Sequence, residues 1–185
     1  MRLPGLPPSE LDPDQRAVYE AITGGPRAAG PRLFDLTDEA GRLLGPFNAM
    51  LLSPPLGAAL QGLGAAIRYE SHLPARSREI AILAVAAHWD SAFEWAAHVA
   101  VGRHAGLGDD ELAAIRSGAS PGDPAERLVL ETVRALLTRS TLTDEEYDAA
   151  VGGLGERALF ELTTLVGYYA MLALQLRVFS GEHPG

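Results

Sequence analysis

The sequence predicts an all-α protein. No segment shows the alternation of apolar and polar residues that is typical of a half-buried strand. Apolar residues instead recur at helical spacing, and residues that favour helix ends stand on either side of these segments. The clearest example follows Ser53, where the residues Leu56, Leu60, Leu63 and Ile67 form one apolar stripe.

Helix-start and helix-stop residues place the expected helices along the chain. Asp12 followed by Pro13 is typical of a helix N-terminus, Thr143 and Glu146 have the spacing of a capping box, and Gly106 is suited to a left-handed helix end. The expected helices, in chain order, run over about 13–23, 54–67, 74–88, 93–105, 109–117, 124–137, from 143 onwards, and over 156–179.

Two parts are expected from composition. Residues 1–46 comprise a Pro-rich arm, one helix, and a surface loop over 24–46 that is rich in Gly, Pro and Arg and has room for one short helix. Residues 47–180 form the main helical domain. The last helix is apolar on several faces, and its tyrosines Tyr168 and Tyr169 are expected in the core, with a place beside the active-site cavity as the alternative. Because a small domain cannot bury every face of one helix, we expect association with further copies of the chain.

Composition excludes several classes of protein. The 185 residues carry a net charge of −9, which disfavours a nucleic-acid binder. Cysteine is absent, so this chain supplies no disulfide, no thiolate nucleophile and no Cys-ligated zinc. The N-terminus does not resemble a signal peptide, and no uninterrupted apolar run reaches the length of a membrane span. We therefore expect a cytoplasmic protein without a membrane partner.

Three residues form a candidate proton-transfer site. Glu94 and His98 are four residues apart and share a helix face. Glu79 stands nineteen residues before His98, about 28 Å away on one unbroken helix. A turn over 88–91 would instead fold the second helix back and bring Glu79 to His98. A carboxylate beside an imidazole fixes the tautomer of the ring and raises its basicity.

Each residue of this site also has a structural interpretation. Glu94 and Ser91 have capping-box spacing, with Asp90 as an alternative cap. Glu94 and His98, with His88 or His104, do not form a tight ligand cluster, so no metal is expected. The sequence has no glycine-rich phosphate loop between a strand and a helix, and no cofactor is expected.

Three motifs resemble the carboxymuconolactone decarboxylase family of the AhpD-like superfamily. They are Leu73-Pro74-x-Arg76-x-Arg78-Glu79, Glu94-Trp95-x-x-His98 and Ala105-Gly106-Leu107. The resemblance covers about residues 45–118 and implies an all-α fold with an active-site helical hairpin, assembled as a trimer or hexamer. In the thiol-bearing branch of the superfamily, cysteines stand seven and four positions before the histidine. Ser91 and Glu94 occupy these positions here, so the thiol peroxidase activity of that branch is not expected.

The resemblance implies an acid–base enzyme, decarboxylase-like, that acts on a small lactone or unsaturated carboxylic acid. His98, Glu79 and Glu94 are the expected catalytic residues. Arg76 or Arg78 is expected to hold a substrate carboxylate, and Ser91 and Trp95 complete the expected substrate-binding set. An isomerase, hydrolase or cyclase on the same site, and a non-catalytic oligomeric binding protein, are the alternatives.

Overall fold

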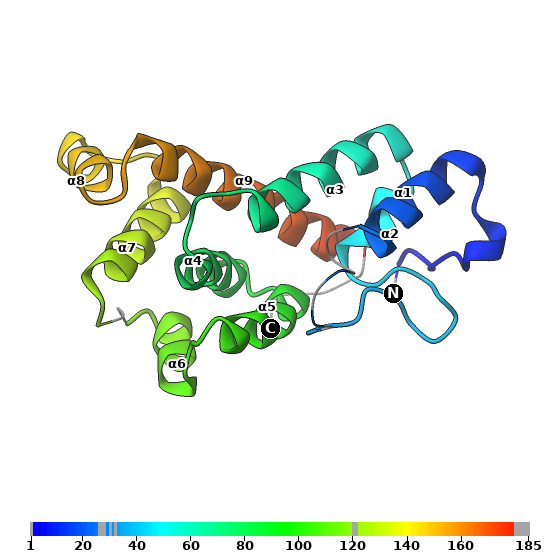
Figure 1. The fold of residues 1–185 in the computed structure, drawn as a ribbon, viewed down its shortest axis with the longest axis horizontal. Helices are drawn as coiled ribbons and strands as arrows, with labels where there is room; N and C mark the ends of the chain where they lie inside the picture. The colour runs from blue at the N-terminus through cyan, green and yellow to red at the C-terminus, as the bar shows by residue number, and fades with distance from the viewer. Residues whose placement is uncertain (1, 26–28, 30, 32, 120–121, 180–185) are drawn as a thin grey trace. The chain divides into compact units, whose positions relative to one another are not determined.

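The computed structural model describes residues 2–25, 29, 31, 33–119 and 122–179 of the chain. The described residues form helices and no strand, with one isolated antiparallel bridge between Thr37 and Leu43, so the predicted all-α class is confirmed. The elements (Figure 1) are η1 Pro8–Glu10, α1 Pro13–Thr23, α2 Pro46–Met50, α3 Pro54–Tyr69, α4 Ala75–His88, α5 Ala92–His104, α6 Asp109–Ser117, α7 Pro124–Arg139, α8 Asp144–Leu154 and α9 Glu156–Phe179.

Side chains cap three of the helices that the sequence signals located. The Asp12 carboxylate accepts a hydrogen bond from the backbone N–H of Gln15, and the Thr143 hydroxyl accepts one from the backbone N–H of Glu146. Asp123 caps α7 in the same way. Because these bonds satisfy backbone donors that a helix leaves unpaired at its first turn, they explain why the helices begin where they do.

The chain divides into two compact units. The first contains residues 1–70 and 172–185, and the second contains residues 71–171. This division does not coincide with the boundary expected after residue 46, because α2 and α3 group with the N-terminal segment. All seven expected site residues lie in the second unit.

In the first unit, α3 packs against α1 and α2. The segment before α2 is a turn in which the Asp38 carboxylate accepts hydrogen bonds from the backbone N–H groups of Ala40 and Arg42. The short helix expected within 24–46 is absent from the described part of that loop, and α2 begins at its end. Residues 26–28, 30 and 32 of the loop lie outside the described residues.

In the second unit, α4 is the central helix. Figure 1 shows it almost end-on, with α5 and α7 beside it, and it also contacts α6. Every residue from Glu79 to Ala86 is buried, as the apolar sequence of this helix indicated. Since α4 carries Glu79 in this buried stretch, the helix that forms the core also places one carboxylate of the candidate site away from solvent.

The last helix, α9, has the bounds that the sequence predicts. Among the described residues it is the one helix long and apolar enough to span a membrane, and half of its most apolar window is buried within the structure. Buried core helices have the same length and composition. Its exposed apolar side chains include Phe160, Leu174 and Val178. Association through such surfaces stays a prediction.

Candidate active site

The chain reverses direction between α4 and α5, as the sequence predicts. Helix α4 ends at His88, Asp90 adopts a left-handed conformation with φ of 49°, and Ser91 precedes the first residue of α5. The backbone N–H of Ser91 donates to the carbonyl of Ala86 at 2.9 Å, which fastens the turn to the end of α4. The two helices therefore lie against each other as a hairpin.

This hairpin brings Glu79 and His98 into direct contact. His98 Nδ1 lies 2.7 Å from Glu79 Oε2, and the two residues are 3% and 0% exposed. An ionised Glu79 carboxylate could only accept this hydrogen bond, and Nδ1 would then be the donor. The predicted juxtaposition is confirmed, and it leaves the other ring nitrogen, Nε2, to exchange a proton with another group.

Glu94 lies on the other side of the imidazole. Its Oε2 is 3.6 Å from His98 Nε2, and its side chain is 5% exposed. The capping-box interpretation of Glu94 is wrong, because the Ser91 side chain makes no capping hydrogen bond. The Ser91 hydroxyl is buried and makes no hydrogen bond within the described part of the chain. Ser91, Glu94 and His98 thus form a buried stripe along one face of α5.

An aromatic ring from α9 packs on the imidazole. The Tyr169 ring meets the His98 ring edge-to-face with centroids 5.1 Å apart, and Tyr168 makes a similar contact with Tyr169 at 5.3 Å. Both tyrosines are buried, as expected. The sequence did not assign Tyr169 to the site, because no local spacing relates α9 to α5. Its ring is a third group, besides the two glutamates, that restricts the orientation of the imidazole.

Arg78 directly precedes Glu79 on α4 and adds a positive charge beside that carboxylate. Its Nε lies 3.6 Å from Glu79 Oε1, while the other oxygen of the same carboxylate contacts His98. The buried Nε makes no hydrogen bond, and the Arg78 side chain is 16% exposed. We refer to Arg78, Glu79, Glu94 and His98 as the histidine cluster.

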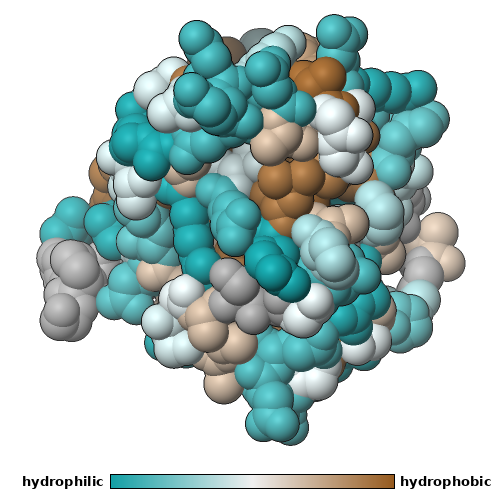
Figure 2. Space-filling model, turned by 90° about the vertical axis from the view of Figure 1, so that its left-hand side faces the viewer, coloured by the Kyte–Doolittle hydropathy of each residue, from teal (hydrophilic) through white to brown (hydrophobic). Residues whose placement is uncertain are grey.

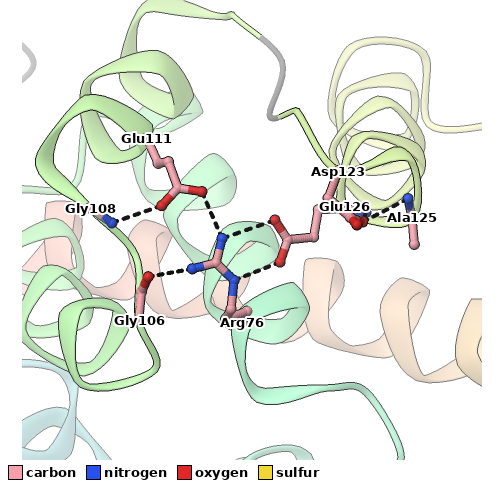
Figure 3. Close-up of polar contacts among 7 residues, drawn as sticks. All are labelled: Arg76, Gly106, Gly108, Glu111, Asp123, Ala125 and Glu126. Carbon is pink, nitrogen blue, oxygen red and sulfur yellow. Dashed lines mark hydrogen bonds and ion pairs between the residues drawn. The ribbon is translucent and has the colours of Figure 1, made fainter.

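Arg76 is in a different environment, although it is only two residues away. Figure 3 shows its guanidinium between Glu111 of α6 and Glu126 of α7, with the Gly106 carbonyl as a third partner. Hydrogen bonds to Glu126, which have the larger effect, and to Glu111 raise the pKa of Arg76 above its ordinary value. We refer to these four residues as the Arg76 cluster. The geometry of this cluster favours a structural role for Arg76, as a cross-link between helices. It does not favour the expected contact of Arg76 with a substrate carboxylate, which stays a prediction.

Trp95 is half-buried on α5, and the Arg116 guanidinium lies 4.8 Å from the centroid of its ring. This cation–π contact joins α5 to α6 and favours a packing role for the ring. A contact of Trp95 with substrate stays a prediction. His88 and His104 are exposed. In the described ranges, no three acidic or histidine side chains converge in an arrangement that would hold a metal ion.

Two grooves lie along the helices that follow the hairpin. One of about 450 Å³ runs between α7 and α8, and one of about 510 Å³ lies between α8 and the start of α9. The face at this end of the molecule (Figure 2) has an apolar patch among hydrophilic residues. Neither groove is lined by a residue of the histidine cluster. An enclosed substrate cavity beside His98 therefore stays a prediction.

Solved structures provide the first comparison. The chain is similar to ATU0492 of Agrobacterium tumefaciens, a protein of unknown function proposed as the antioxidant defence protein AhpD, with a TM-score of 0.63 and 20% identity over 75% of this chain and 97% of that one. It is also similar to the debrominase Bmp8. A cysteine-to-alanine variant of Bmp8 in complex with 2,3,4-tribromopyrrole has a TM-score of 0.72 and 16% identity over 97% of this chain and 90% of that one. The apo debrominase gives the same TM-score and identity, with 98% and 91% coverage. At these identities the likeness shows the fold alone.

Sequence comparison gives a family-model match over part of the chain. No curated protein matches the chain. Residues 54–135 match the model of the carboxymuconolactone decarboxylase family. This segment runs from the start of α3 into α7 and contains the whole histidine cluster. The chain thus has an AhpD-like all-α fold without cysteine, and its segment 54–135 is similar to the carboxymuconolactone decarboxylase family.

Proposed function

We propose that the protein is a thiol-independent acid–base enzyme that acts on a small lactone or unsaturated carboxylic acid. His98 is its proton-transfer residue, Glu79 orients the imidazole, and Glu94 is a second proton carrier. The observation that carries the proposal is the 2.7 Å contact between Glu79 Oε2 and His98 Nδ1 in a buried environment, with Glu94 on the Nε2 side of the ring.

This arrangement suits a reaction in which a carbon atom gains or loses a proton. In a decarboxylation, the bond between the substrate carbon and its carboxylate breaks, the electron pair moves into a conjugated carbonyl, and CO₂ leaves. The Nε2–H of His98 then delivers a proton to the resulting carbanionic carbon, and the ring recovers a proton through Glu94 or solvent. Glu79 stabilises the ring in its protonated form during these steps.

Isomerisation, hydrolysis or cyclisation on the same residues is the second candidate. The same histidine and carboxylates can move a proton between two carbons without loss of CO₂. Thiol chemistry of the superfamily is disfavoured, because the chain has no cysteine and carries Ser91 and Glu94 at the expected thiol positions. We also propose, from the resemblance, a cytoplasmic trimer or hexamer as the working form.

The test is a screen for proton exchange at carbon. The protein is incubated in D₂O with a panel of unsaturated carboxylic acids and γ-lactones, and the products are analysed by mass spectrometry and NMR. Deuterium incorporation that requires the protein supports the acid–base enzyme, and release of CO₂ identifies a decarboxylase. Deuterium incorporation without CO₂ identifies an isomerase or cyclase, and a ring-opened product without deuterium on carbon identifies a hydrolase.

His98→Gln is the decisive variant, and His104→Gln is its matched control. Both residues lie on α5, but His104 is exposed and outside the cluster. We expect His98→Gln to lower the exchange rate by about 100- to 10,000-fold, the usual contribution of a positioned acid or base, while His104→Gln has no effect. Equal rates for the two variants, or no exchange with any member of the panel, would count against the enzyme and favour a binding protein.

A further inference from the structure

The two arginines of the Leu73–Glu79 motif are not equally available to a ligand. The Arg76 guanidinium donates four hydrogen bonds to two carboxylates and one carbonyl, so its charge is compensated and one of its five N–H groups remains. Arg78 donates no hydrogen bond within the described chain, and its nearest acidic atom is Glu79 Oε1 at 3.6 Å. Of the pair, Arg78 has more donors left for a ligand and no partner that neutralises it at hydrogen-bond distance.

Arg78 is also the member of the histidine cluster that solvent can reach. Its side chain is 16% exposed, whereas those of Glu79, His98 and Glu94 are between 0% and 5% exposed. The part of the cluster that solvent reaches therefore belongs to the Arg78 side chain, although its Nε is buried. A guanidinium with free donors binds a planar carboxylate through two parallel hydrogen bonds.

The charges around Arg78 limit the ligand to one carboxylate. Among the described residues, Glu79 of α4, Glu94 of α5 and Tyr169 of α9 are titratable groups that contact His98. Two of these are acids, and both would repel a second carboxylate beside the ring. Arg76 cannot offset that repulsion, because Glu111 and Glu126 already neutralise it.

We propose that Arg78 is the ligand-anchoring residue of this site, and that it selects small unsaturated monocarboxylic acids over neutral lactones and over dicarboxylic acids. The inference rests on the proposed function for the reaction at His98. The binding step itself does not require turnover. A binding site of this kind narrows the proposed substrate class to molecules that carry one negative charge.

The test measures binding with crotonate, its neutral analogue crotonamide and the dicarboxylate fumarate, by ligand-observed NMR titration. We expect crotonate to bind at least tenfold more tightly than the other two. Arg78→Gln should weaken crotonate binding by about 10- to 100-fold, the loss expected for hydrogen bonds to a charged group, and should leave crotonamide unaffected. Arg78→Lys keeps the charge without the paired donors and should give an intermediate affinity.

Arg103→Gln is the matched control, because Arg103 is an exposed arginine of α5 that pairs with Asp109. It should bind crotonate as the unaltered protein does. The inference would be overturned if crotonate and crotonamide bound with equal affinity, or if fumarate bound more tightly than crotonate. It would also be overturned if Arg78→Gln left the binding of millimolar crotonate unchanged.

Failure of the inference can be distinguished from failure of the proposed function. His98→Gln should retain crotonate binding while it loses proton exchange. Binding that depends on Arg78, in a protein that exchanges no proton with any acid, would contradict the enzyme and leave the anchor intact. Exchange that is unaffected by Arg78→Gln would contradict the anchor alone.

Discussion

Arg76 and Arg78 stand two residues apart on α4, yet they serve two different regions of the second unit. Arg76 joins α4 to α6, α7 and the turn before α6 through a closed set of hydrogen bonds. Arg78 lies beside the Glu79 carboxylate that contacts His98 and makes no hydrogen bond in the described chain. The difference shows that one short motif supplies both a cross-link of the fold and a charge that remains available to a ligand.

The two clusters also differ in their exposure. The side chains of the Arg76 ion pairs are 12% to 37% exposed, whereas Glu79 and His98 are almost completely buried. Partly exposed ion pairs contribute modestly to stability, and buried charges are costly unless their partners are well placed. Substitutions in the Arg76 cluster should therefore affect stability, and substitutions in the histidine cluster should affect chemistry.

The largest effect is expected for Glu79→Gln. The amide oxygen can still accept the Nδ1 hydrogen bond, but it no longer stabilises a positive charge on the ring. We expect proton exchange to fall by about 100- to 10,000-fold, with little change in the melting temperature. Glu70→Gln, at an exposed glutamate of the first unit, is the control. Unchanged exchange in Glu79→Gln would show that this carboxylate is structural.

Arg76→Met should give a smaller effect of a different kind. The substitution leaves Glu111 and Glu126 without their shared cation. We expect a loss of about 2 kcal/mol in the free energy of unfolding, because the hydrogen bonds involve charged but partly exposed groups. Thermal unfolding should occur about 4–8 °C lower. Crotonate binding by the folded protein should be unchanged. If binding fell while stability did not, Arg76 would belong to the ligand site after all.

The smallest effect is expected from the pH dependence of the Arg76 cluster. The backbone N–H of Gly108, and then the Arg76 guanidinium, lower the pKa of Glu111. A lowered pKa means that the ionised group stabilises the fold at pH values above its ordinary value of about 4.3. That contribution is lost as the pH falls through the lowered pKa. Glu111→Gln should therefore lower the melting temperature at pH 6, and this difference should shrink as the pH falls below the ordinary pKa and through the lowered one.

Glu131→Gln provides the comparison for that measurement, since Glu131 is exposed on α7 and has no ion pair in the described chain. Its melting temperature should follow that of the unaltered protein at every pH. A constant difference between Glu111→Gln and the unaltered protein from pH 6 to pH 3 would contradict the role of the ionised Glu111.

Local signals in the sequence predicted much of the fold. Capping residues and helical spacing located the helices, and the turn near Trp89 brought Glu79 to His98 as expected. These predictions succeed because caps, turns and helix faces depend on residues that are close together in sequence.

The remainder depends on contacts between distant segments. The partners of Arg76 are 35 and 50 residues away, so its spacing within the motif did not separate it from Arg78. Tyr169 reaches His98 from α9 for a similar reason. The capping-box interpretation of Glu94 was wrong because its contact with His98 replaces the bond to the backbone of Ser91. Local propensity did not decide between these two partners.

The proposed function requires that Glu79 holds the proton of His98 on Nδ1, so that Nε2 is the nitrogen that exchanges its proton with the substrate. Long-range ¹H–¹⁵N NMR of the imidazole, assigned with His98→Gln, measures this directly. The account predicts a protonated Nδ1 whose signal shifts in Glu79→Gln, and an Nε2 signal that changes when crotonate is added. A ring protonated on Nε2 alone, or signals that neither Glu79→Gln nor crotonate alters, would contradict it.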